Sequence, residues 1–247
     1  MPDPQTTRRQ VLATTAAAAA LAEQIQPAQA AILQGEQPFS PLDHSPPELP
    51  EGQGWLFFTP EEARAVEAAV ERLIPADDLS PSGKEAGCAV FIDRQLAGTH
   101  GTSAKLYTQG PFQEGTPQQG DQSALVPQQR YRRGLAALDA FCRQQHQRPF
   151  AELPPETRDS ILTELEGGKI TLPGFEAKML FEALLQNTME GFFADPIYGG
   201  NRDMVSWKML GFPGARYDYR DYVERHNERL DLPPLSIAGR PEWRRRS

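Results

Sequence analysis

The sequence holds 247 residues with a formal net charge of −8, which is enough chain for one domain of ordinary size. The acidic balance argues against nucleic-acid binding, because phosphate recognition needs a basic face that releases counterions. Beyond residue 30 no stretch is long and apolar enough to cross a bilayer, so membrane association is expected only through a partner.

The first 30 residues have the layout of a secretory signal peptide. The pair Arg8 and Arg9 follows a hydroxyl residue and precedes hydrophobic ones, as in twin-arginine signals. A weakly apolar, alanine-rich stretch at 11–22 and a small-residue exit at 28–30 complete the pattern. We predict cleavage after Ala30 and a location in the periplasm, whereas the alternatives are a disordered basic leader and a weak amphipathic helix. Because the twin-arginine route carries folded cargo, the chain is expected to bind a partner or cofactor before export.

Residues 31–58 are predicted to form a Pro-rich extended arm. Five prolines interrupt any regular element, and the segment ends in the run Trp55-Leu56-Phe57-Phe58. The arm is either a plain linker or a segment laid on another protein. Exposed aromatic side chains on a free linker are unusual, so Trp55 and Phe57 are predicted to contact a partner.

A helical domain is predicted over 59–230, followed by a C-terminal tail at 231–247. Thr59 is the expected N-cap of the first helix, with Pro60 at its first position and Glu62 completing a capping box. Pro75 stops this helix. Residues 99–126 lack periodicity and are predicted to form a long loop, which either has a function of its own or is ordered by a partner. Further helices are predicted over 86–96, 127–147, 155–165 and 174–193, the last being the most apolar and the expected central helix.

Strand-like alternation is almost absent, so the predicted fold is all-α: an irregular small helical domain with long loops and the extended N-terminal arm. The two cysteines, Cys88 and Cys142, are predicted to form a disulfide, because paired cysteines are usual in the periplasm. Such a bridge would close a loop of about 55 residues and stabilise the fold by ~3–4 kcal/mol on the chain-entropy model. An interchain bridge and free buried thiols are the alternatives.

The sequence lacks the motifs of several catalytic classes. There is no G-x-G-x-x-G fingerprint for a dinucleotide, no C-x-x-C-H for covalent haem and no cysteine cluster for iron and sulfur. The four histidines are scattered, none stands three residues after a glutamate, and no serine lies in a G-x-S-x-G elbow. We therefore predict no catalytic, cofactor-binding or metal-binding residue in this chain.

The segment 195–214 is predicted to form a rigid loop, a helix and a second loop. Gly199 and Gly200 allow a tight turn, Asn201 is the expected cap of a helix over 202–210, and glycine and proline at 211–214 end it. Arg202, Trp207 and Lys208 are expected to be exposed. Half of such elements are plain structure, but this one is rich in the residue types that dominate binding energy at interfaces. Its predicted partner contacts are Tyr198, Asn201, Arg202 and Trp207.

The block ADPIYGGNRDMVSWKMLGFPG, the earlier segment FFTPEEARAVEAAVERLIPADD and the twin-arginine leader together resemble the gluconate 2-dehydrogenase small (gamma) subunit family. The resemblance implies a complex with a large FAD-containing dehydrogenase subunit and a multihaem cytochrome c subunit, on the outer face of the bacterial inner membrane. It implies no cofactor in this chain, since FAD and haem c belong to the other subunits. The small subunit often supplies the export signal in that family.

Three functions remain open at this point. The chain is a non-catalytic subunit that escorts and stabilises a flavoprotein, a stand-alone periplasmic enzyme that binds a sugar acid at the 194–214 loop, or a free assembly chaperone. The resemblance does not fix the substrate, because gluconate, 2-ketogluconate, glucose, fructose and sorbitol are all compatible with it.

Overall fold

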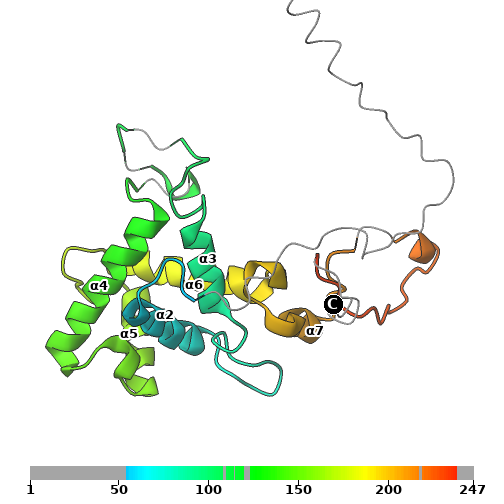
Figure 1. The fold of residues 1–247 in the computed structure, drawn as a ribbon, viewed down its shortest axis with the longest axis horizontal. Coiled ribbons are helices and arrows are strands. Elements are labelled where there is room, and N and C mark those ends of the chain that lie inside the picture. Colours follow the sequence, from blue (N-terminus) through cyan, green and yellow to red (C-terminus); the bar gives the residue numbers. More distant parts are fainter. Residues whose placement is uncertain (1–53, 108–109, 114, 120–122, 217–218, 238–247) are drawn as a thin grey trace, which may run out of the picture. The chain divides into compact units, whose positions relative to one another are not determined.

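A computed structural model describes residues 54–237, apart from 108–109, 114, 120–122 and 217–218. The leader with Arg8 and Arg9, and most of the Pro-rich arm, lie outside the described residues. Those described form no strand, only two isolated bridges, so the all-α prediction is confirmed. The α-helices are α2 (Pro60–Leu73), α3 (Cys88–Ala97), α4 (Pro127–His146), α5 (Pro155–Glu166), α6 (Ala177–Phe193) and α7 (Val205–Leu210) (Figure 1).

The start of α2 agrees with its predicted cap. The Thr59 hydroxyl accepts a hydrogen bond from the Glu62 N–H at 3.3 Å, and the Glu62 carboxylate accepts one from the Thr59 N–H at 2.9 Å. This reciprocal capping box satisfies two N–H groups that the helix itself leaves unpaired. The helix ends at Leu73, just before Pro75.

Helix α6 packs against α2, α3, α4 and α5 (Figure 1), which is the central position expected for the most apolar segment. Its side chains Leu180 and Leu184 are almost fully buried. Across the outside of this core, a bidentate ion pair joins α2 to α5: Arg72 donates to both carboxylate oxygens of Asp159, at 2.6 and 2.7 Å. The guanidinium group holds the pKa of Asp159 below its usual range, through the hydrogen bond first and its charge second.

The predicted disulfide is absent, because Cys88 and Cys142 are both free, buried thiols. Helices α3 and α4 meet near Leu96 and Gln128, where the Gln128 amide donates to the Leu96 carbonyl at 2.8 Å. From there the helices diverge (Figure 1), and each cysteine lies near the end of its helix that is remote from this contact. The divergence of the two helices thus explains why the cysteines do not form the disulfide that the predicted compartment and the even cysteine count suggested.

Neither thiol is expected to react in the folded protein. Burial raises the pKa of Cys88 to about 12, and burial followed by the charge of Asp139 raises that of Cys142 to about 12, against about 8.5 for a free thiol. The folded protein holds both protons more tightly than the unfolded chain does. With respect to these two thiols, the free energy of unfolding is therefore highest below about pH 8.5 and falls as pH rises toward 12. At pH 8, alkylation should label both cysteines only after denaturation, and a linked peptide in a non-reducing digest would contradict this.

Candidate functional site

The 194–214 segment lies tightly against the end of α6. After the short 3₁₀ turn Pro196–Tyr198, the chain passes so close to the helix that a Cβ atom on Gly200 would lie 2.1 Å from the Gly191 carbonyl oxygen. Only glycine allows this backbone approach. The next turn is tied to the start of α3, because the Arg202 N–H donates to the Ala86 carbonyl at 3.0 Å.

Two of the predicted partner contacts are interior residues of this segment. Asn201 is fully buried; its amide donates to the Ala194 carbonyl at 2.9 Å, and its Oδ1 accepts from the Ser206 N–H and hydroxyl at 3.0 and 2.8 Å. Trp207 is only 6% exposed, and its indole Nε1–H donates to the Phe193 carbonyl at 2.9 Å. The expectation of an exposed Trp207 is therefore wrong: both side chains fix the segment to α6.

The outer side of the same segment presents other residues. Tyr198 is 46% exposed, and Arg202 is exposed as predicted. The sequence did not single out Leu210 and Phe212, which are 63% and 45% exposed where α7 ends. The Phe212 and Trp207 rings pack in a T-shaped arrangement at 5.2 Å between centroids, so Phe212 contacts Trp207 while nearly half of its surface stays exposed.

The aromatic run at 55–58 packs on its own domain. Trp55 and Phe57 are half-buried against the core, and Phe58 is buried within it. The Arg132 guanidinium lies 4.1 Å from the centre of the Phe57 ring, a favourable cation–π contact. Both side chains therefore pack against their own domain while staying partly exposed, and their contact with a partner stays a prediction.

A buried carboxylate anchors this run. Asp93 of α3 is fully buried. Its Oδ1 accepts from the N–H groups of Phe57 and Phe58, both at 2.9 Å, and its Oδ2 accepts from that of Leu56 at 2.8 Å. Arg94 pairs with Oδ2 at 2.9 Å. The sequence shows a charged residue within the apolar stretch of α3, but the backbone N–H groups that Asp93 binds lie 35 to 37 residues away in sequence.

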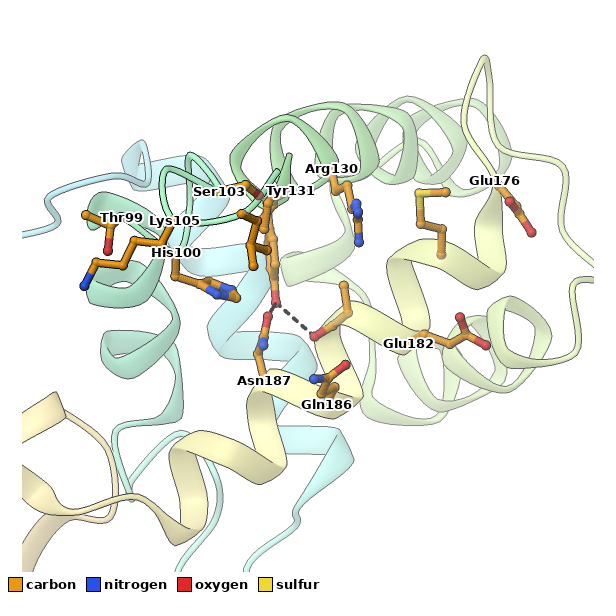
Figure 2. A pocket seen from close by; sticks show the side chains of 14 residues that line it. Thr99, His100, Ser103, Lys105, Arg130, Tyr131, Glu176, Glu182, Gln186 and Asn187 are labelled. Atoms are coloured by element: carbon orange, nitrogen blue, oxygen red, sulfur yellow. Dashed lines mark hydrogen bonds between the residues drawn. The ribbon is translucent and has the colours of Figure 1, made fainter. Parts of the chain in front are cut away.

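An open cleft of about 860 Å³ lies between residues 99–106, the start of α4 and α6 (Figure 2). Its floor is Tyr131, whose hydroxyl lies 2.9 Å from Asn187 Oδ1 and 3.2 Å from the Ala183 carbonyl oxygen. Burial raises the pKa of Tyr131 far above its usual range, so the hydroxyl stays protonated and cannot act as a base near neutral pH.

The walls of the cleft carry charges of both signs. Lys105 and Glu176 lie at opposite ends, and His100 extends toward the middle (Figure 2). Arg130 is held by the Leu125 carbonyl, which accepts from its Nε at 2.9 Å, and burial lowers the pKa of this arginine. The cleft can form hydrogen bonds to a polar ligand or peptide, but its mixed charges select no single ligand class.

Neither a metal cluster nor a membrane span emerges from the described part of the chain. Within it, no group of three or more His, Cys, Asp or Glu side chains could hold a metal ion, and no helix has the length and apolar character that a bilayer span requires.

Comparison with known proteins gives one assignment. The family model described as gluconate 2-dehydrogenase subunit 3 matches residues 60–214, which is more than half of the chain. Neither a curated protein nor a solved structure matches significantly. The matched range runs from the first residue of α2 to Gly214, beyond the end of α7, and thus includes helices α2 to α6 and the 194–214 segment. The chain therefore belongs to the gluconate 2-dehydrogenase subunit 3 family.

Proposed function

We propose that this chain is the non-catalytic small subunit of a periplasmic, FAD-dependent complex of the gluconate 2-dehydrogenase type. In this proposal it escorts a flavoprotein subunit through twin-arginine export and then stabilises it on the outer face of the bacterial inner membrane. The observation that carries the proposal is the family match over residues 60–214, because the family is named for one subunit of a dehydrogenase.

Two further observations support an escort role. The leader of this chain carries the pair Arg8 and Arg9 in the twin-arginine pattern, and folded cargo is what that route transports. The described surface also exposes large apolar side chains near the end of α7, including Leu210 and Phe212. Exposed apolar groups that gather in one region commonly mark protein interaction sites.

The proposed partners carry the redox chemistry. FAD is assigned to the large dehydrogenase subunit and haem c to a multihaem cytochrome subunit, which also provides the membrane attachment. No cofactor is assigned to this chain. Since the proposed role gives it no substrate of its own, the large subunit determines which sugar or sugar acid is oxidised.

Replacing Arg8 and Arg9 together by lysine is expected to retain both this chain and its flavoprotein partner in the cytoplasm. The reason is that a single signal serves the whole complex, and lysine keeps the charge but not the guanidinium pair. Cell fractionation with immunodetection and a dye-linked dehydrogenase assay should show near-complete loss of periplasmic activity. Arg64→Lys is the matched control, because Arg64 forms only an exposed ion pair with Glu61. Normal periplasmic activity in the double variant would refute the escort role.

Purification through a tag on this chain separates the remaining functions. A stable subunit brings the flavoprotein with it from the periplasmic or membrane fraction. A free chaperone is absent from the mature complex, and a stand-alone enzyme oxidises gluconate or a related sugar as the isolated chain. The substrate follows from assaying the recovered complex against candidate sugars and sugar acids.

A further inference from the structure

The segment 214–237, of which the structure describes all residues but 217–218, begins and ends at the same place and is here called the hook. At its base, the Ala215 N–H donates to the Leu235 carbonyl at 2.6 Å and the Leu235 N–H donates to the Pro213 carbonyl at 3.1 Å. A Cβ atom on Gly214 would lie 2.2 Å from the Leu235 oxygen, and the residue has φ of +81°. Only glycine fits this crossing, so the sequence is adapted to close the hook at this point.

A buried carboxylate joins the end of the hook to the domain. Asp195 is 8% exposed and Ser236 is 7% exposed. Asp195 Oδ1 accepts from the Ser236 hydroxyl at 2.8 Å and from the Ile197 N–H at 3.0 Å, while Oδ2 accepts from the Ile237 N–H at 2.8 Å. Hydrogen bonds to an ionised acceptor are stronger than neutral ones, so Asp195 holds two segments some forty residues apart in sequence.

Between these two fixed points, the hook adds nothing to the core. None of its described residues from 215 to 234 is buried, although a 3₁₀ turn at Arg220–Tyr222 gives it local order. Tyr219 is 39% exposed and Val223 is 61% exposed. A closed, anchored loop whose described residues bury no side chain between its two fixed ends is better explained by binding than by stability.

The charges and apolar groups of the hook favour a protein as its occupant. Residues 214–237 hold four arginines and five acidic residues, so the segment has almost no net charge with which to attract phosphate groups of nucleic acid or anionic lipid. Further large apolar residues are exposed at the end of the hook, at Ile237, and in the segment before it, at Tyr198, Leu210 and Phe212. Tyrosine and other aromatic residues are enriched in protein interfaces.

We infer that the hook is the docking element for the flavoprotein subunit, and that Tyr219 and Val223 are its contact residues. This inference rests on the proposed function and names the surface involved. Asp195 is a positioning residue: it fixes the hook before binding, which reduces the entropy lost on association. The hook begins where the matched range of the family ends, so the family assignment gives it no role.

The inference is tested by co-purification from cells that express the flavoprotein and the tagged full-length chain. Tyr219→Ala combined with Val223→Ala should lower the recovered flavoprotein on the order of tenfold or more, as expected for interface hot spots. The melting temperature of the isolated variant should equal that of the wild type, because neither side chain is buried. Leu79→Ala is the matched control: Leu79 is 74% exposed between α2 and α3, and its replacement should leave recovery unchanged.

Asp195 is tested separately. Asp195→Ala should weaken recovery and speed tryptic cleavage within the hook, while Asp195→Asn, which keeps one carbonyl acceptor, should restore part of both. Full flavoprotein recovery with the double variant would overturn the inference but leave the proposed function standing. A wild-type chain that recovers no flavoprotein would overturn both.

Discussion

Replacing Asp93 by alanine is expected to lower the free energy of unfolding by about 3–5 kcal/mol, the usual range for removing one partner of a buried ion pair. The substitution leaves the N–H groups of Leu56, Phe57 and Phe58 without their acceptor, and that of Phe58 is buried. It also deprives Arg94 of its carboxylate. Urea unfolding followed by circular dichroism measures the loss.

The same variant should release the aromatic run from the domain. Trp55 is half-buried and packs edge-on against Phe58 at 6.3 Å between ring centroids, so its fluorescence should shift to the red before global unfolding. Asp93→Asn, which retains an oxygen acceptor, should show a smaller loss. Asp78→Ala, at an exposed position in the α2–α3 connection, should change stability by no more than about 0.5 kcal/mol. A loss below about 1 kcal/mol for Asp93→Ala would show that the anchor is dispensable.

Trp207→Ala is expected to destabilise the protein by about 3–5 kcal/mol, the range for a buried tryptophan truncated to alanine. The change opens a cavity against α6 and leaves the Phe193 carbonyl without its donor. For a domain of this size, such a loss corresponds to a fall in melting temperature of roughly 10 °C, which differential scanning calorimetry would detect.

Trp207→Phe separates the two contributions of this residue. Phenylalanine keeps an aromatic ring beside Phe212 but lacks the indole N–H, so its expected loss is about 1–3 kcal/mol, near that of one unsatisfied buried group. If Trp207→Ala melts like the wild type yet loses the flavoprotein, Trp207 belongs to the interface and the interior assignment is wrong.

Local chemistry explains which elements the sequence could predict. The start of α2 depends on Thr59, Pro60 and Glu62 within four residues, so its capping box was visible without any tertiary information. The apolar character of α6 was equally local and indicated a central helix. These features are set by residues that are neighbours in the chain or share one helix face.

Other features depend on partners distant in sequence. Asp93 acts on a segment 35 to 37 residues earlier, and Asp195 on one 41 to 42 residues later, so neither role follows from spacing. Helix α7 spans only six residues, which is too short for hydrophobic periodicity to show which face is buried. For this reason Trp207 was expected on the surface.

The free thiols of Cys88 and Cys142 bear on where the chain can complete its folding. A core that contains no cross-link needs neither an oxidant nor a disulfide isomerase, and cytosolic reductants leave buried thiols as they are. The helical domain can therefore reach its final packing in a reducing compartment. Under the proposed export route, the helical domain would be fully packed before transport, and the oxidising side of the membrane would add no disulfide to it.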